Sequence, residues 1–347
     1  MSGRDGLLAT ALRIALPVIM AFAAGALFLL ALGKNPLEYY AFVFQRGLFS
    51  WAGLQETITR SAPLLLIAAG LIVAFRAGIW NLGVDGQFLL AAVVCSALAP
   101  WLIGFLPRWL TLVTSLLAAG LVGASWSLIP ALLKARYGVN EIITTLMMSF
   151  LGISFANVLI KLVFADPGTT VPQTRTLPVP YRLPRLFDTT IHFGIIIALA
   201  AILAVHFIMT RTAFGLKLRI VGANPRAAIH AGLPMAGLTF ATFALSAALI
   251  GMGGAVDILG VFGTVRADWN PSYGLLVIPL VFLARFNGLG SIIFVLLFAA
   301  LQIGGESAAR RLDVPHYYVL LLVSLVLLFL AIVEYLDHLS AQRRTAV

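Results

Sequence analysis

The sequence predicts an all-α integral membrane protein with about ten transmembrane helices. Of its 347 residues, 61% are hydrophobic and only 10% are charged, whereas a soluble domain carries about 25% charged residues. Apolar runs that approach the roughly 20 residues needed to cross a bilayer recur along the whole chain. We therefore interpret residues 1–347 as one transmembrane domain, without a separate soluble domain.

The expected spans follow one another with short connections. They are 14–32, 62–75, 88–106, 110–133, 142–164, 191–209, 235–259, 272–284, 289–304 and 316–336. Two of them, 62–75 and 272–284, are short for a full crossing, which predicts tilted or broken helices. The first run is too long for the apolar core of a signal peptide, so we expect a retained first helix.

The positive charges predict how the chain is oriented. The formal net charge is +10, and lysines and arginines concentrate in cytoplasmic loops. Ten spans with both termini cytoplasmic place three basic segments, 134–140, 210–234 and the tail, on the cytoplasmic side. No basic run is interleaved with aromatic residues, so we expect no nucleic-acid partner.

Motifs of soluble enzymes are missing from the sequence. It has no G-x-x-x-x-G-K-[ST] loop for ATP, no H-E-x-x-H and no G-x-S-x-G. The single cysteine, Cys95, lies in an apolar run, and no Cys/His cluster has zinc spacing. We therefore expect no enzyme activity, no metal and no cofactor.

The segment 165–190 is rich in proline, which ends helices because it lacks a backbone donor. We expect an ordered or extended, non-helical external loop. It is either a plain connector or a docking surface for an external partner.

The stretch Phe75–Gln87 separates two apolar runs. It contains three glycines and the polar residues Arg76, Asn81, Asp85 and Gln87. It is either a cytoplasmic turn or a broken helix, and irregular backbone at membrane depth is tolerated only where protein or water satisfies it. Broken helices of this kind form solute sites in transporters.

The stretch Gly138–Met148 opens a new span. Asn140 is suited to cap a helix, and Glu141 is favourable at the positive end of the helix dipole. Capping explains these two residues but not Thr144 and Thr145, although such threonines often bond their own backbone.

Segment 210–234 contains a very short helix. Asn224 followed by Pro225 predicts its start, and Gly232 predicts its end. About seven residues do not form a stable helix alone, so it must dock against something. Arg226 and His230 share one face. The helix is either a lever held by a soluble motor or an interfacial helix resting on anionic lipid.

Residues 237–263 are rich in glycine and alanine, which predicts close helix packing. Asp257 is the exception, because an acid deep in a span is expensive and marks a functional site by default, unless the helix ends early and the acid lies at the outer surface. Asn157 and Gln302 are weaker examples of the same pattern.

Together these stretches resemble the permease subunits of ATP-binding-cassette (ABC) importers for ribose, other simple sugars, nucleosides and branched-chain amino acids. Phe75–Gln87 resembles F-R-A-G-x-x-N-I-G-x-E-G-Q, with Leu82 and Asp85 in place of Ile and Glu. Gly138–Met148 resembles G-x-N-E-x-x-x-T-x-M, and Gly222–Gly232 resembles the coupling segment G-x-N-P-x-A-A-x-x-x-G. The resemblance covers nearly the whole chain.

The nucleoside-type branch is the most similar. The resemblance implies a transport subunit of the bacterial cytoplasmic membrane that moves a nucleoside and has no ATPase site of its own. It also implies three protein partners: an ABC ATPase, a second homologous permease and an external substrate-binding lipoprotein. The residues expected near the solute pathway are Asn81, Asp85, Gln87, Asn140, Thr144, Thr145 and Asn157. Those expected to couple to the ATPase are Gly222, Asn224, Pro225, Arg226, Ala228, His230 and Gly232.

Other functions stay open at this point. The first alternative is a ribose-like sugar permease of the same family. An ion-coupled secondary transporter predicts an internal repeat and many deep ionisable groups, and neither is evident. A membrane scaffold or intramembrane enzyme leaves the short basic helix and the glycine-rich break unexplained.

Overall fold

The computed structural model describes residues 3–315 and 317–345. Within these residues the regular secondary structure is helical, and β-pairing is confined to isolated bridges. The predicted all-α class is therefore confirmed.

Seven described helices are long and apolar enough to cross a membrane, which makes the chain a multi-pass membrane protein. Two of them, α6 and α10, continue into a π-helical turn. The seven are α3 (Trp51–Arg76), α4 (Val84–Leu102), α5 (Arg108–Tyr137), α6 (Glu141–Val158), α7 (Gly194–Arg211), α10 (Met235–Asp257) and α12 (Gly288–Leu312). Shorter apolar stretches lie in α1 (Gly3–Ala31), α11 (Tyr273–Leu283) and α13 (Tyr318–Thr345). The total of ten crossings stays a prediction.

The helix expected at 62–75 is longer than predicted. α3 spans 26 residues and begins at Trp51, because polar residues in its first turns find partners inside the protein. The Thr57 hydroxyl, for example, donates to the Gly47 carbonyl at 2.8 Å. By contrast, α11 is as short as expected, with 11 residues.

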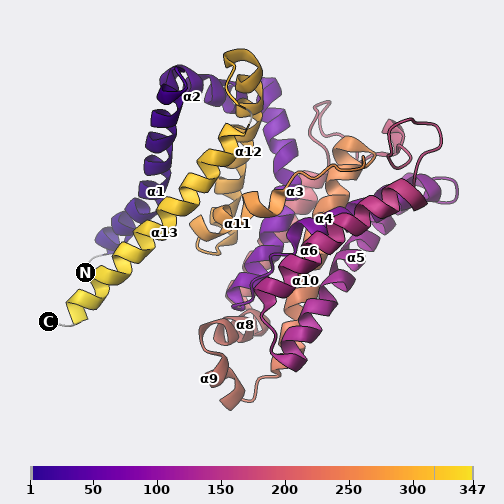
Figure 1. Cartoon of the computed structure of the whole chain (residues 1–347). Helices are drawn as coiled ribbons and strands as arrows, with labels where there is room; N and C mark the ends of the chain where they lie inside the picture. Colours follow the sequence, from indigo (N-terminus) through magenta and orange to yellow (C-terminus); the bar gives the residue numbers. More distant parts are fainter. Residues whose placement is uncertain (1–2, 316, 346–347) are drawn as a thin grey trace. The chain divides into compact units, whose positions relative to one another are not determined.

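The described chain divides into two compact units. Unit 1 contains Met1–Thr57 and Leu296–Val347, so it combines both ends of the sequence. In it α1 packs along α13 (Figure 1). The Tyr40 hydroxyl lies 2.8 Å from the Tyr318 hydroxyl and donates to the Phe22 carbonyl at 2.9 Å.

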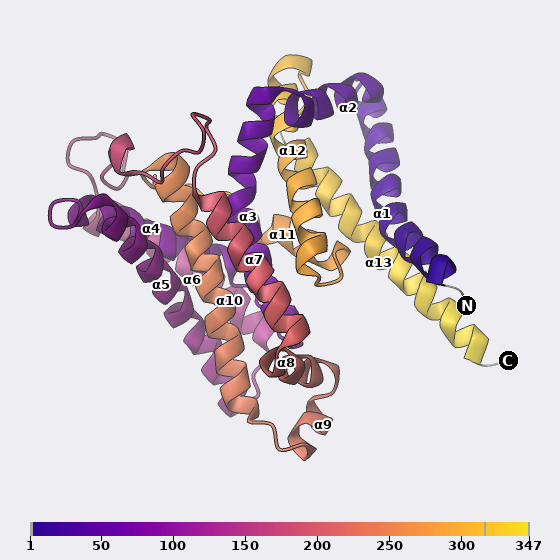
Figure 2. The ribbon, with the colours of Figure 1, turned by 180° about the vertical axis from the view of Figure 1, so that it is seen from behind.

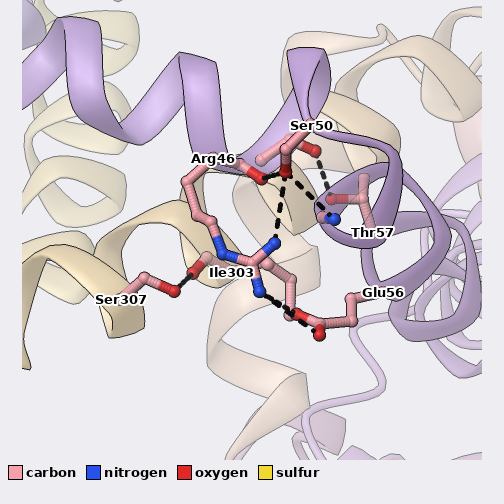
Figure 3. Close-up of polar contacts among 8 residues, drawn as sticks. Arg46, Ser50, Glu56, Thr57, Ile303 and Ser307 are labelled. Atoms are coloured by element: carbon pink, nitrogen blue, oxygen red, sulfur yellow. Dashed lines mark hydrogen bonds and ion pairs between the residues drawn. The ribbon is translucent and has the colours of Figure 1, made fainter.

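Unit 1 also contains a sharp corner that was not predicted. There α2 (Pro36–Phe44) continues as a π-helical turn, Gln45–Phe49, and α3 begins after Ser50 (Figure 3). The Ser50 hydroxyl donates to the Arg46 carbonyl at 2.8 Å, and the Arg46 guanidinium lies 3.3 Å from the Glu56 carboxylate. These contacts satisfy the backbone where it turns, whereas the partly exposed ion pair itself contributes at most about 1 kcal/mol.

Unit 2 contains Ile58–Val295. In it α10 packs against α4 and α5, and α4 also packs against α6. The predicted close packing of small residues is confirmed on α10, where a Cβ on Gly254 would collide with the Phe88 carbonyl. Two short helices, α8 (Ala213–Ala223) and α9 (Pro225–His230), lie at one end of unit 2 (Figure 2).

The proline-rich segment 165–190 is ordered and mostly non-helical, as predicted, and lies at the other end of unit 2. It is held by the residues that follow α10. The Thr174 backbone amide donates to Val265 at 3.0 Å, and the Arg182 guanidinium donates to the Val261 carbonyl at 2.7 Å. Burial lowers the pKa of Arg182, and the positive charge of the nearby Arg185 lowers it further.

Candidate functional site

A non-helical stretch runs through the interior of unit 2. α3 ends at Arg76 and α4 begins at Val84, and Ile79 and Asn81 between them are 2% and 0% exposed. The break predicted at Phe75–Gln87 is therefore partly buried, with Gly78 and Trp80 exposed and Ile79 and Asn81 turned inward. Backbone of this kind needs internal hydrogen-bond partners.

The Asn81 side chain links this segment to neighbouring helices. Its amide nitrogen donates to Gln87 Oε1 and Ser246 Oγ, both at 3.1 Å. Its oxygen accepts from Gln87 Nε2 and from the Gly83 backbone amide, also at 3.1 Å. Both donors and both lone pairs of the amide are used, so Asn81 joins the break to α4 and α10.

Two hydroxyls of α6 complete this group. Thr145 Oγ1 accepts from the Leu82 amide at 3.1 Å and donates to the Glu141 carbonyl at 2.6 Å. Ser149 Oγ accepts from the Gly86 amide at 3.1 Å. Ser149 thus satisfies an amide that the start of α4 leaves without a helical partner. We call Asn81, Gln87, Thr145, Ser149 and Ser246 the Asn81 cluster.

Asp85 lies in the first turn of α4 but acts on another helix. Its Oδ1 accepts from the Gly274 amide at 2.8 Å, in the first turn of α11. A carboxylate at this position satisfies an otherwise free amide and complements the helix dipole. The short α11 is therefore held at its start by α4.

The other residues expected along the pathway lie away from the Asn81 cluster. Asn140 is exposed and caps α6, accepting from the Ile142 amide at 2.8 Å. The Thr144 hydroxyl donates to the Asn140 carbonyl at 3.2 Å. Asn157 lies towards the opposite end of α6 and accepts from the Asp268 amide at 2.7 Å. The contacts of Asn140 and Thr144 are local, whereas that of Asn157 reaches the segment after α10; a pathway role for the three residues stays a prediction.

The short helix predicted between Asn224 and Gly232 is present. Asn224 Oδ1 accepts from the Ala227 amide at 3.0 Å, and Pro225 is the first residue of α9. Gly232 ends the helix with φ +72°. Ala228 is buried, whereas both Arg226 and His230 are exposed. The exposed basic side chains are thus free to meet a partner.

Gly222, at the end of α8, touches the beginning of the break. A Cβ on Gly222 would lie 2.5 Å from the Arg76 carbonyl and 2.9 Å from the Gly78 nitrogen. Gly78 itself has φ +70°, a conformation that favours glycine. The end of α8 therefore packs directly against the backbone of the segment that leads to Asn81.

Sequence reasoning missed Ser149 and Ser246. Both lie in apolar helices, where serines commonly bond their own backbone. The sequence around Ser149 and Ser246 does not distinguish them from such serines, because their hydrogen-bond partners, Gly86 and Asn81, lie far away in the chain.

The chemistry of the Asn81 cluster is that of neutral hydrogen-bond donors and acceptors. Among the described residues, no group of three or more His, Cys, Asp or Glu side chains could hold a metal ion. The hydrogen bonds of the cluster stabilise the non-helical segment between α3 and α4.

Comparison with known proteins identifies the family. The family described as branched-chain amino acid transport system / permease component matches residues 53–331, which include the break, α8 and α9. The glucose ABC transporter permease protein TsgB13 of Haloferax volcanii is 33% identical over 92% of this chain and 87% of its own length. The guanosine ABC transporter permease protein NupP of Bacillus subtilis is 29% identical over 90% and 91%, and the nucleoside ABC transporter permease protein NupB of Lactococcus lactis is 28% identical over 91% and 89%. The chain therefore belongs to the family of permease components of branched-chain amino acid transport systems.

Proposed function

We propose that the chain is the permease subunit of an ABC importer that moves a nucleoside across the bacterial cytoplasmic membrane. ATP is hydrolysed by a partner ATPase, and this subunit has no ATPase site. The guanosine and nucleoside permeases among its relatives align over about nine-tenths of the chain, which supports the solute class.

The contact between Gly222 and the backbone of Arg76 to Gly78 carries this proposal. α9 has six residues, too few to be stable alone, and it presents Arg226 and His230 to a partner. A ligand or partner shifts a conformational equilibrium only through contacts that differ between the two states. The ATPase makes such contacts with α9, and Gly222 passes the displacement to the break.

The remaining partners follow from the same assignment. A second, homologous permease completes the pathway, and an external lipoprotein delivers the solute. Both termini and segment 210–234 are cytoplasmic, and loop 165–190 is external, as the positive charges predict. In this arrangement the binding protein makes the first choice of solute, and the Asn81 cluster lies close to the pathway.

A sugar is the second candidate solute. The glucose permease relative has the higher identity, 33%, and aligns over most of both chains. Glucose and a nucleoside share a ring with several hydroxyl groups, so the same polar pathway suits either.

Uptake of labelled guanosine, uridine, ribose and glucose tests the proposal in cells with and without the chain. Each assay is run with ATP depleted and, separately, with the proton gradient collapsed. We expect nucleoside uptake that needs both the chain and ATP and that survives collapse of the gradient.

Two other results contradict parts of the proposal. Uptake that follows the proton gradient indicates a secondary transporter. If cells without the chain lose only glucose or ribose uptake, the chain is still an importer subunit, but its solute is a sugar.

A further inference from the structure

The end of α10 holds a buried carboxylate that the coupling mechanism does not use. Asp257 is 2% exposed, and its Oδ2 is buried without a hydrogen-bond partner among the described residues. Leaving a buried carboxylate oxygen without a donor is unfavourable. A purely structural acid would be expected to satisfy both oxygens, so the free oxygen points to a donor from elsewhere.

Two side chains from other helices hold this acid. Arg60 Nη1, from α3, donates to the Tyr273 hydroxyl at 3.0 Å. The Tyr273 side chain in turn hydrogen-bonds Asp257, and Arg60 interacts electrostatically with the same carboxylate. The three residues thus form a chain from a guanidinium through a hydroxyl to a carboxylate.

This group is continuous with the break. Tyr273 begins α11, and the next residue, Gly274, donates its amide to Asp85 in the first turn of α4. Asp85 is four residues from Asn81 along the chain. Asp85 is one of the residues expected near the pathway, so this group adjoins the proposed pathway through Gly274 and Tyr273, and Arg60 is half-buried.

The donor and acceptor pattern selects a class of ligand. A guanidinium offers several fixed donors, and an ionised carboxylate only accepts. Two adjacent hydroxyl groups match this pair, because one accepts from the guanidinium while the other donates to the carboxylate. We propose that Arg60 and Asp257 bind vicinal hydroxyl groups of the solute, either a ribose or a hexose, and that Tyr273 positions them. This inference rests on the proposed function.

The test compares each solute with an analogue that lacks the vicinal pair. Cells with the intact importer take up guanosine or 2′-deoxyguanosine, and glucose or 2,3-dideoxyglucose, at concentrations that saturate the binding protein. The variants are Asp257→Asn and Arg60→Lys, and each rate is normalised to the amount of permease in the membrane. Asp268→Asn is the matched control, because Asp268 is exposed and pairs with Lys161 at 3.1 Å.

We expect Asp257→Asn to slow guanosine uptake at least about tenfold, the effect of losing one hydrogen bond to a charged group. Uptake of 2′-deoxyguanosine should stay within about twofold, and Asp268→Asn should change neither rate. If Asp257→Asn instead slows uptake of glucose but not of 2,3-dideoxyglucose, and leaves guanosine uptake unchanged, the hydroxyl groups belong to a hexose.

An equal loss for the solute and its analogue overturns the hydroxyl proposal, because a structural role affects both. Unchanged rates overturn it too. If Asp257→Asn does not accumulate in the membrane, the selective loss in Arg60→Lys decides. The unmodified chain distinguishes the two proposals. If it imports solute with ATP but the variants show no selective loss, only the hydroxyl proposal fails. If it imports neither a nucleoside nor a sugar, the proposed function fails as well.

Discussion

Asn81 is a buried amide with every hydrogen-bonding position occupied. Its partners are two side chains and a backbone amide, from the break, α4 and α10. In a low-dielectric interior such a network is stable only when each member is satisfied. Removing the amide leaves Gln87, Ser246 and the Gly83 amide without partners at once.

We expect Asn81→Ala to lower the stability of the protein by about 2–3 kcal/mol, because buried polar groups lose their partners. Thermal unfolding in detergent measures the effect. Asn140→Ala is the matched control, since Asn140 is exposed and only caps α6, a role worth about 1 kcal/mol. A larger loss for Asn140→Ala than for Asn81→Ala would contradict the structure.

Part of this site could be predicted from the sequence. The glycines and polar residues of Phe75–Gln87 indicate a break, and capping at Asn140 and Asn224 follows from local rules. The contacts of Asp85 with Gly274 and of Asp257 with Tyr273 could not be predicted, because tertiary packing brings those helices together.

At the scale of elements, α8 and α9 lie next to the break. Asn224 separates α8 from α9 by a single residue. Gly222 lies just before it and touches the backbone of residues 76–78. The proposed function predicts that a displacement of α9 reaches the break through this close backbone contact.

Gly222→Ala tests this contact. The added Cβ meets the Arg76 carbonyl at 2.5 Å, so the end of α8 must move away from the break. We expect a stable permease that still binds its ATPase but transports at least about tenfold more slowly, measured as solute moved per ATP hydrolysed.

Gly237→Ala is the control for that variant. Gly237 is also helical, and nothing lies within 4 Å of its added Cβ. We expect transport unchanged and stability unchanged or raised by up to about 1 kcal/mol. If Gly222→Ala and Gly237→Ala move the same amount of solute per ATP hydrolysed, the Gly222 contact does not transmit the displacement.

The boundaries of the elements show where sequence reasoning stops. Hydropathy locates the apolar part of α3 but not its first turns, where Gln55, Glu56 and Arg60 lower the average. Arg60 is accommodated by Tyr273, which is more than 200 residues away. The corner at Gln45–Phe49 was not predicted, because its π-helical turn depends on contacts such as that of Thr57 with Gly47.

At the scale of the whole molecule, the proposed orientation places α8 and α9 on the cytoplasmic side and loop 165–190 outside. Exposed positions at both ends of unit 2 are suited to test this. Ala231 follows α9, and Thr170 lies in the loop. The native Cys95 is 0% exposed, so it need not be removed.

We expect a membrane-impermeant maleimide to label Thr170→Cys in intact cells, and Ala231→Cys only after the cells are opened. The unmodified chain is the control and should not react, because Cys95 is buried. The opposite pattern would reverse the orientation and contradict docking of α9 to a cytoplasmic ATPase.

The composition of unit 1 has a consequence for how the protein is made. α1 packs along α13, so α1 meets its partner only after the helices between them in the sequence, α2 to α12, have been synthesised. At about 5–20 residues per second, that delay lasts tens of seconds. Throughout this time α1 lacks the helix against which it packs. Closure of unit 1 therefore follows the synthesis of α13, and a product cut short before α13 leaves a surface of α1 exposed by which quality-control proteases can recognise it.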